Sequence, residues 1–390
     1  MSIFNIASTI TITCHKWHAP YLEKEIIELG YQIERTFITG VKIKGTLTDC
    51  IRLNLNLNCA SQVLYSLGNF TAENSNEVYD YVRKIEWDQY LDKEGYFTVT
   101  SNVRHPSITN SMYANVKVKD AVVDHFRDKY NIRPSSGSEF NGAVFHLYWT
   151  EYEAELFIDT TGESLARHGY RKIPGAAPML EALASSTIIA SGWDKKSNFI
   201  NPMCGSGTLA IEAALMATGA KPGIHRNHYA FMHLNDYQED DYFGQLDEIE
   251  NNTLDQLDFK IIASDHDEFA IQNAKKNAIA AGVADLIDFE ICDFTETTIP
   301  ENGGVLFMNP EYGERLGSLE ALEVTYKSIG DFMKNQCRGY NGYIFTGNLD
   351  LAKKIGLKAK RRIEFFTGKI DCRLLEYELY QGSRDPKKLN

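Results

Sequence analysis

Two short motifs in the second half of the chain carry residue types suited to group-transfer chemistry. The first is a glycine loop, which follows a short apolar strand and precedes a helix rich in Ala, Ile and Leu: Asn201-Pro202-Met203-Cys204-Gly205-Ser206-Gly207-Thr208. Glycines let the backbone turn tightly beside a ligand, and the helix start offers free N–H groups. The loop is neither a Walker loop nor a full dinucleotide fingerprint, because no Gly-Lys-Ser/Thr follows and position 210 is Ala. Nucleoside triphosphates and NAD therefore fit poorly, although an ordinary strand-to-helix turn would also explain the loop.

The second motif follows the apolar strand 305–308 and reads Asn309-Pro310-Glu311-Tyr312. It resembles the N-P-P-[YFW] signature of class I S-adenosylmethionine-dependent methyltransferases that modify an exocyclic or amide nitrogen. An aryl amine is a poor nucleophile, because its lone pair is delocalised into the ring. Asn309 and the Pro310 carbonyl can each accept one amine N–H and redirect that lone pair, while Tyr312 stacks on a flipped base. Glu311 replaces the second proline and is interpreted as a solvated loop charge.

Two acidic residues, Asp265 and Asp293, follow later strands of the same region. Carboxylates at such positions can accept hydrogen bonds from a ribose or an adenine amino group, or they can simply cap a helix. The resemblance implies that the loop meets the methionine part of S-adenosylmethionine, with Asp265 on the ribose and Asp293 and Phe294 at the adenine. It implies these loop residues for cofactor binding: Asn201, Pro202, Cys204, Gly205, Ser206, Gly207 and Thr208. Asn201 replaces the commoner Asp and so removes a charge near the cofactor's ammonium group.

The elements that position these motifs alternate between strand and helix from residue 198 onward, which predicts a parallel sheet wrapped by helices. The tail, with extended segments at 361–367 and 371–380, predicts an antiparallel hairpin at the sheet edge. The first 160 residues mix both element types. There we expect strands at 3–12, 40–44, 50–57, 96–101, 143–149 and 153–159, and helices at 21–29, 60–67, 78–84 and 113–130.

A longer pattern extends the resemblance to nearly the whole chain. In THUMP-containing RNA methyltransferases, a specific stretch of sequence leads into the catalytic domain. Three segments here are similar to it: 159–165, 168–171 and 177–184, with His168 as a one-residue variation on R-G-Y-R. The chain is most similar to the RlmL family, which methylates the 2-amino group of a guanine in 23S ribosomal RNA. The resemblance implies a ferredoxin-like α+β domain at 1–60, a THUMP RNA-binding domain at 61–160 and a Rossmann-like methyltransferase domain with a seven-stranded sheet at 161–390.

Composition limits the other possibilities. Hydrophobic residues make up 43% of the chain and charged residues 24%, as in ordinary globular proteins, and the net charge is −13. The seven cysteines form no C-x-x-C pair, so neither disulfides nor a metal site is expected. No signal peptide or long apolar run is present, so a cytoplasmic protein is expected.

Local basic residues can still bind RNA on an acidic protein. The candidates are Lys117, Lys119, Arg133, Lys358, Lys360, Arg361 and Arg362, which a solvated surface would also explain. The expected partner is large-subunit ribosomal RNA, free or within a precursor particle, with no membrane and no obligate protein partner. Two alternatives stay open: methylation of an adenine 6-amino group or a protein glutamine, and a decayed, non-catalytic RNA-binding assembly factor.

Overall fold

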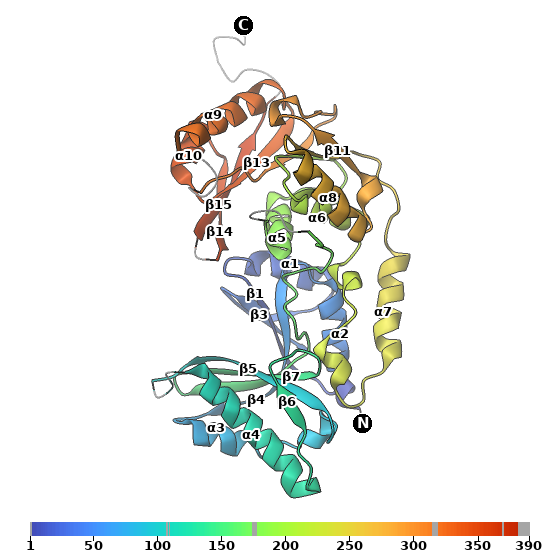
Figure 1. The fold of residues 1–390 in the computed structure, drawn as a ribbon, viewed down its shortest axis with the longest axis vertical. Helices are drawn as coiled ribbons and strands as arrows, with labels where there is room; N and C mark the ends of the chain where they lie inside the picture. The colour runs from blue at the N-terminus through green and yellow to red at the C-terminus, as the bar shows by residue number, and fades with distance from the viewer. Residues whose placement is uncertain are drawn as a thin grey trace. The chain divides into compact units, whose positions relative to one another are not determined.

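The computed structural model describes residues 2–106, 108, 110–173, 178–313, 319–368 and 370–380. The chain forms two compact units, each with its own sheet (Figure 1). Unit 1 contains Met1–His15, Leu22–Ala166 and Pro222–Asn251, and unit 2 contains Lys16–Tyr21, Arg167–Lys221 and Asn252–Asn390. Each unit is therefore assembled from separate stretches of the sequence.

Unit 1 is built on an eight-stranded sheet in the order β2-β3-β1-β4-β8-β7-β5-β6. Its strands are β1 (Ser8–Cys14), β2 (Ile33–Phe37), β3 (Gly40–Gly45), β4 (Ala60–Thr71), β5 (Tyr96–Arg104), β6 (Ser135–Gly137), β7 (Ala143–Thr150) and β8 (Glu153–Asp159). Its helices are α1 (Ala19–Glu28), α2 (Leu47–Asn56), α3 (Ser75–Val82), α4 (Ser111–Tyr130) and α7 (Glu239–Asn251). Strand β4 pairs with β1 through its first half and with β8 through its second. The ferredoxin-like and THUMP parts expected from the sequence thus share one continuous sheet.

Two elements expected in unit 1 are wrong. The expected strand at 50–57 is helix α2, and the expected helix at 60–67 is strand β4. In α2, Asn54 occupies a core-facing position and donates to the carbonyl of Cys50 at 2.8 Å and to Thr160 Oγ1 at 2.9 Å. This polar residue interrupts the pattern of apolar residues by which a helix is recognised in the sequence. In strand β4 the four consecutive residues 63–66 are buried, so this part lacks the alternation of a half-exposed strand.

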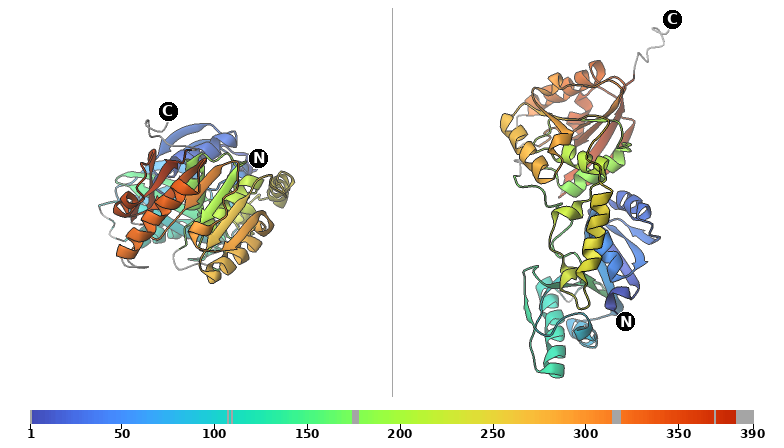
Figure 2. Two further views of the ribbon diagram at one scale, coloured as in Figure 1. Left: turned by 90° about the horizontal axis from the view of Figure 1, so that it is seen from above. Right: turned by 90° about the vertical axis from the view of Figure 1, so that its right-hand side faces the viewer.

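Unit 2 contains the expected seven-stranded sheet (Figure 2), and its strands follow the order β11-β10-β9-β12-β13-β15-β14. Its strands are β9 (Asn198–Pro202), β10 (Ile261–Asp265), β11 (Ile287–Ile291), β12 (Gly304–Met308), β13 (Tyr340–Thr346), β14 (Arg361–Thr367) and β15 (Ile370–Glu378). The helices are α5 (Glu181–Ser191), α6 (Thr208–Thr218), α8 (Glu268–Ala280), α9 (Leu319–Asn335) and α10 (Leu349–Lys354). The first five strands are parallel, and β15 and β14 form the expected antiparallel edge hairpin.

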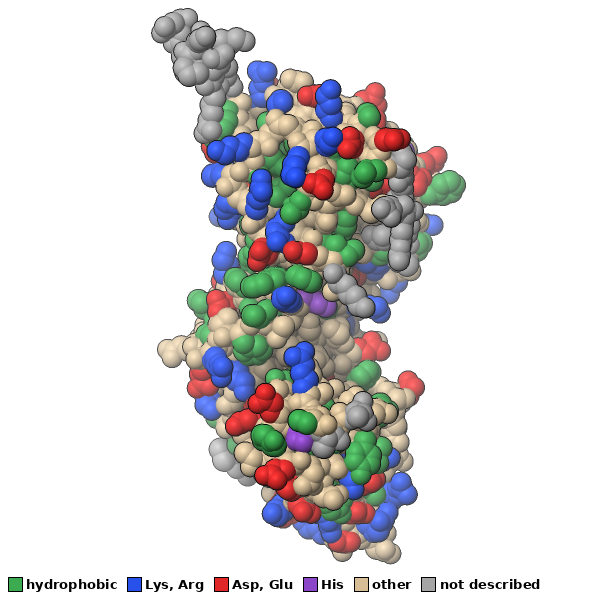
Figure 3. Space-filling view, turned by 90° about the vertical axis from the view of Figure 1, so that its left-hand side faces the viewer, with side chains coloured by type: hydrophobic (Ala, Val, Ile, Leu, Met, Phe, Trp, Pro, Cys, Tyr) green, Lys and Arg blue, Asp and Glu red, His purple; other side chains and the backbone are tan. Residues whose placement is uncertain are grey.

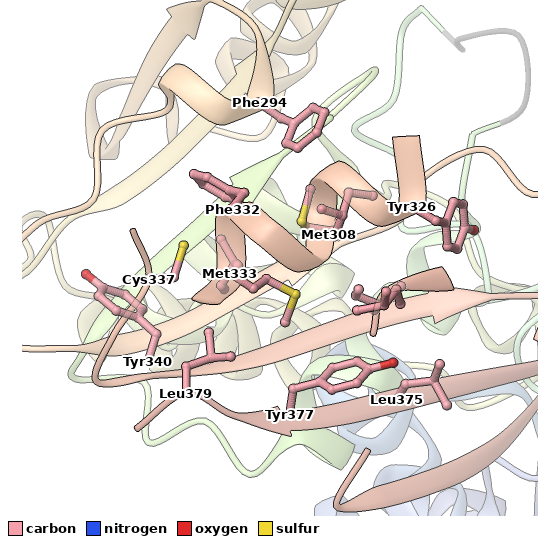
Figure 4. Close-up of a cluster of buried hydrophobic side chains, with 14 of the residues drawn as sticks. Phe294, Met308, Tyr326, Phe332, Met333, Cys337, Tyr340, Leu375, Tyr377 and Leu379 are labelled. Atoms are coloured by element: carbon pink, nitrogen blue, oxygen red, sulfur yellow. The ribbon is translucent and has the colours of Figure 1, made fainter. Parts of the chain in front are cut away.

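A cluster of buried side chains fixes α9 and α10 against one face of this sheet. It joins Met308, Tyr326 and Phe332 to residues of β13 and β15 (Figure 4). Burial of this apolar surface, at roughly 25 cal/mol per Å², is the main force that holds the helices on the strands. The cluster lies directly beneath the end of β12, so it gives the motif that follows β12 a rigid support.

Three further observations complete the description of the fold. Helix α7 lies in an acidic stretch of the sequence between the glycine loop and Asp265, and it packs against α2 within unit 1. Ala177 of the similarity pattern lies outside the described residues. Within the part of the chain that the structure describes, no helix is long and apolar enough to cross a membrane.

Candidate functional site

The two motifs meet at one point of the unit 2 sheet. The chain leaves β9 toward β10 and β11 and then returns to β12 on the other side of β9, so the order reverses between β9 and β12. In open α/β sheets, ligands bind beyond the carboxyl ends of the strands at such a reversal. The glycine loop leaves β9 and the Asn309 motif leaves β12 at this position.

A side-chain hydrogen bond joins the two motifs. Asn201 is buried, and its Nδ2 donates to the carbonyl of Phe307 at 2.8 Å. The contact lies just beyond the paired residues Ile200 and Leu306, so it continues the strand pairing into the site. The amide orientation follows from this contact, because Oδ1 in that place would face another acceptor. An aspartate at this position could not donate this hydrogen bond when ionised.

The two glycines of the loop have different structural roles. Both have positive φ angles, +54° at Gly205 and +82° at Gly207. A Cβ on Gly207 would lie 2.9 Å from Ala274 Cβ of α8, so this glycine permits close packing between helices. A Cβ on Gly205 would meet no atom within 4 Å, so Gly205 faces open space, as a ligand cradle requires. Met203 also has a positive φ of 55°, a strained backbone position that the sequence did not indicate.

The remaining loop residues are mostly buried. Pro202, Ser206 and Thr208 are buried, and the Ser206 carbonyl accepts a hydrogen bond from Asn277 Nδ2 at 3.2 Å. Burial raises the pKa of the Cys204 thiol, and the nearby Asp265 carboxylate adds to this shift. The thiol therefore stays protonated at neutral pH, which argues against a thiolate nucleophile in the loop.

The acidic residues lie at the expected strand ends. Asp265 Oδ2 accepts the N–H of Gly205 at 2.9 Å, and its Oδ1 accepts the N–H of Asp267 at 3.0 Å. Asp293 is exposed and caps a short 3-10 helix through the N–H of Thr295 at 2.9 Å, which is the capping role weighed from the sequence. The ring of Phe294 is mostly buried and lies edge-on to Phe332 in the core cluster (Figure 4). Asp293 and Phe294, the two residues expected at the adenine, are therefore fixed by local contacts.

The Asn309 motif contains an unpaired hydrogen-bond acceptor and an aromatic ring held in place by packing. Asn309 Oδ1 is shielded from solvent and has no hydrogen-bond partner among the described residues. Pro310 is buried, and Tyr312 is half-buried with its ring edge-on to Phe345 at 6.5 Å between centroids. A Cβ on Gly347 would lie 2.9 Å from the Tyr312 ring, so the ring rests directly on this backbone. Burial raises the pKa of the Tyr312 hydroxyl, so Tyr312 is a neutral aromatic surface at physiological pH.

Two unpaired amide oxygens make the site suitable for a ligand rich in N–H donors. Oδ1 of Asn201, like Oδ1 of Asn309, is buried without a partner in the described part of the chain. An unsatisfied buried acceptor costs about 1–3 kcal/mol, so two at one strand reversal favour a bound partner that donates to them. The open space at Gly205 and these oxygens fit S-adenosylmethionine and an amine substrate.

A buried network behind the glycine loop was not predicted from the sequence. Glu212 of α6 accepts from Tyr170 at 2.8 Å and from Ser185 at 2.7 Å, and His168 lies 2.8 Å from the same carboxylate. Burial disfavours the charge of Glu212, but His168 and the hydrogen bonds outweigh burial and lower its pKa. Position 168, where the similarity pattern has Arg, therefore supplies the partner of a buried carboxylate.

The expected RNA-binding residues differ in their exposure to solvent and in their hydrogen-bond and ion-pair partners. Lys117 donates to Asn76 Oδ1 at 3.1 Å, whereas Lys119 is half-buried and Arg133 is exposed. At the edge hairpin, Arg361 pairs with Glu376, and Lys360 lies 3.6 Å from Glu376 and 3.5 Å from Glu378.

Lys358 and Arg362 are exposed and form no ion pair with any described residue. Figure 3 shows Lys and Arg side chains of unit 2 gathered on one face with a few acidic ones between them. Lys358, which precedes β14, and Arg362 of β14 are therefore the most available of the expected RNA-binding cations in the described part of unit 2.

Comparison with protein families gives matches along most of the chain. Residues 168–376 match the family described as RMKL-like, methyltransferase domain. Residues 72–141 match the THUMP domain, and residues 9–64 match the RlmL ferredoxin-like domain. These three segments follow the order expected from the sequence.

Comparison with individual proteins gives relatives at similar identity. The chain is 33% identical over 357 residues to the Synechocystis protein named "Putative RNA methyltransferase slr0064", covering 92% of this chain and 93% of the relative. It is 34% identical over 378 residues to the ribosomal RNA large subunit methyltransferase K/L of Syntrophotalea carbinolica, covering 94% of this chain and 53% of the relative. The chain thus spans about half the length of the K/L relatives.

Two solved structures have the same fold over nearly the whole chain. One is described as "SMU.472, a putative methyltransferase complexed with SAH" and has a TM-score of 0.87 at 25% identity, covering 97% of this chain and 99% of that one. The other is a predicted N6-adenine-specific DNA methylase from Listeria monocytogenes, with a TM-score of 0.85 at 26% identity, covering 96% and 97%.

Proposed function

This chain belongs to the RMKL-like methyltransferase family, and we propose that it methylates the exocyclic 2-amino group of a guanine in large-subunit ribosomal RNA. The observation that carries the proposal is the buried, unpaired Oδ1 of Asn309 at the strand reversal. An acceptor in that position is suited to one N–H of an amine. The THUMP match and the K/L relatives support RNA, and specifically ribosomal RNA, as the substrate class.

The cofactor is S-adenosylmethionine, which supplies an electrophilic methyl group on a sulfonium. The glycine loop would hold its methionine part beside Gly205, with Asn201 Oδ1 as an acceptor. Asp265 would accept from the ribose hydroxyls, because each carboxylate oxygen that binds one backbone N–H still has a free lone pair. Asp293 and Phe294 would border the adenine. These roles for the cofactor-binding residues are part of the proposal.

Three residues would act on the target base. Asn309 Oδ1 accepts one N–H of the amine, and the Pro310 carbonyl accepts the other, so the nitrogen lone pair is drawn out of conjugation with the ring. Tyr312 stacks on the base from its fixed position on Gly347. No strong general base is needed, because the nitrogen becomes acidic only as the new bond forms and its proton can leave late.

RNA would be held by basic residues of both units. We assign phosphate contacts to Lys117, Lys119 and Arg133 in unit 1 and to Lys358, Lys360, Arg361 and Arg362 in unit 2. Such contacts position the RNA without reading its sequence. A ribosomal RNA substrate, free or in a precursor particle, would place the reaction in the cytoplasm.

The direct test is radiolabelled methyl transfer to deproteinised large-subunit ribosomal RNA from a strain that lacks this gene. The product nucleosides are then identified by mass spectrometry. The proposal expects 2-methylguanosine at a single position. A product that contains only N6-methyladenosine would overturn the base assignment and retain the methyl chemistry.

Methylation of an adenine 6-amino group is the second candidate. It is favoured by the similar Listeria structure, described as a predicted N6-adenine-specific DNA methylase, and by the fact that an adenine amine also needs a hydrogen-bond acceptor such as Asn309. Parallel reactions on adenine-containing DNA and RNA distinguish the candidates, because only the second candidate expects methyl transfer to either of them at adenine. A decayed binding protein is tested by calorimetric titration with S-adenosylhomocysteine, since a decayed pocket would give no heat.

A further inference from the structure

A buried carboxylate lies behind the glycine loop without a full set of partners. Glu181 is the first residue of α5 and is only 3% exposed. Its Oε1 lies 3.5 Å from Arg171 Nε, whereas its Oε2 is shielded from solvent and has no hydrogen-bond partner within the described part of the chain. Burial raises the pKa of Glu181, against the opposing effect of Arg171. A buried carboxylate oxygen left unpaired is costly, so this position favours a ligand that donates to it.

Arg171 connects this carboxylate to the cofactor loop. Its Nη2 donates to Thr208 Oγ1 at 2.9 Å and to the carbonyl of Met179 at 2.6 Å. Thr208 ends the glycine loop and begins α6, and α5 packs directly against α6 (Figure 1). A single guanidinium group therefore contacts both the Glu181 carboxylate and the end of the loop. Glu181 is thus linked to the end of the loop through one residue.

The charge balance of the loop indicates which ligand group this oxygen would bind. The methionine part of the cofactor carries an α-ammonium group, and residues 201–208 contain no acidic side chain. Asn201 is neutral where the family pattern commonly has Asp, so the loop lacks the usual negative charge. Asp265 already places one carboxylate beside Gly205 and is assigned to the ribose, and Glu181 adds a second carboxylate to this region. A charge-assisted hydrogen bond from an ammonium is stronger than one from a neutral donor.

We propose that Glu181 is a cofactor-binding residue, whose Oε2 accepts a hydrogen bond from the α-ammonium group of S-adenosylmethionine. Arg171 acts as a positioning residue, which holds the carboxylate in place and ties it to Thr208. The proposal rests on S-adenosylmethionine as the cofactor and is independent of which base is methylated.

The test compares two ligands that differ in the amino-acid part. S-adenosylhomocysteine carries the ammonium, whereas 5′-methylthioadenosine lacks the whole amino-acid end. Both are titrated by calorimetry into the full-length protein and into Glu181→Gln. We expect the variant to bind S-adenosylhomocysteine about 10- to 100-fold more weakly, since a hydrogen bond to a charged group is lost, and to bind 5′-methylthioadenosine as the wild type does.

Retained binding of 5′-methylthioadenosine also reports that the variant is folded. The matched control is Glu239→Gln, because Glu239 is likewise the first residue of a helix, α7, but is exposed. This control should bind both ligands unchanged. Glu181→Asp, which keeps the charge on a shorter side chain, should lose less affinity for S-adenosylhomocysteine than Glu181→Gln.

Two results would overturn the proposal. Unchanged affinity of Glu181→Gln for S-adenosylhomocysteine would exclude the contact, and equal losses for both ligands would assign Glu181 a purely structural role. Failure of the wild type to bind S-adenosylhomocysteine would instead contradict the use of this cofactor as well. The failure of the Glu181 assignment is thus distinguishable from failure of the enzyme assignment.

Discussion

The hydrogen bond from Asn201 to Phe307 makes a measurable prediction for Asn201→Asp. The substitution hardly changes the side-chain volume, but at neutral pH it places a carboxylate oxygen where Nδ2 now lies 2.8 Å from a carbonyl oxygen. The variant loses one hydrogen bond and buries a charge at a position with almost no solvent exposure. The loss of the bond and the unpaired charge together cost about 2–4 kcal/mol of unfolding free energy.

For a unit of this size, that cost corresponds to a fall of about 5–10 °C in the midpoint of thermal unfolding without ligand. Differential scanning calorimetry of the free protein is the assay. Asn341→Asp is the control, because Asn341 is exposed on β13 and the same chemical change there should leave the midpoint unchanged. A free Asn201→Asp protein as stable as the wild type would refute the idea that this amide joins the two motifs.

Three further predictions concern the packing of the Tyr312 ring, a buried carboxylate and the edge hairpin. Gly347→Ala should displace the Tyr312 ring, because a Cβ there lies 2.9 Å from that ring. Turnover, measured by methyl-transfer kinetics, should fall about 10-fold or more, and the affinity for S-adenosylhomocysteine, measured by calorimetry, should be kept. Unchanged turnover would contradict this prediction. Burial raises the pKa of Asp159 from its usual 3.8 to about 7, so the folded state binds the proton more tightly than the unfolded state. Unit 1 should therefore lose stability as pH rises from about 4 to about 7. The stability measured by urea unfolding should depend less on pH in Asp159→Asn, and an equal dependence in both proteins would count against the prediction. Arg362→Ala should weaken RNA binding in filter-binding assays and reduce its salt dependence by about one phosphate contact, with no loss of stability. Arg361→Ala should in addition lower stability, because Arg361 loses its ion pair with Glu376 of β15. Unchanged RNA binding by Arg362→Ala would reject the assignment.

The sequence predicted unit 2 well because its elements follow simple periodic patterns. Strands β9, β10 and β12 are short apolar runs followed by helices, as the alternation from residue 198 onward predicted. The edge hairpin was also expected and is confirmed. Unit 1 was harder to predict, because the buried Asn54 disrupts the apolar pattern of α2. In β4 the consecutive buried residues 63–66 remove the alternation by which a strand is usually recognised.

The site was predicted at the level of motifs but not of contacts. Asn309 and the glycine loop could be found from residue type and spacing, and the structure places them at one strand reversal. The contacts from Arg171 to Thr208 and from His168 to Glu212 join segments about 40 residues apart in the chain. The similarity pattern includes Arg171 and Glu181, but only the folded packing of α5 against α6 gives them partners.

The most direct test of the central claim is single-turnover methyl transfer by Asn309→Ala, alongside calorimetric binding of S-adenosylhomocysteine. Because Oδ1 has no partner among the described residues, its removal should not lower the stability of the free protein. Losing an acceptor that is used in the transition state should slow methyl transfer about 100- to 1000-fold and leave cofactor affinity within about 2-fold. Methyl transfer at the wild-type rate would contradict the account, because the unpaired oxygen would then have no part in orienting the amine.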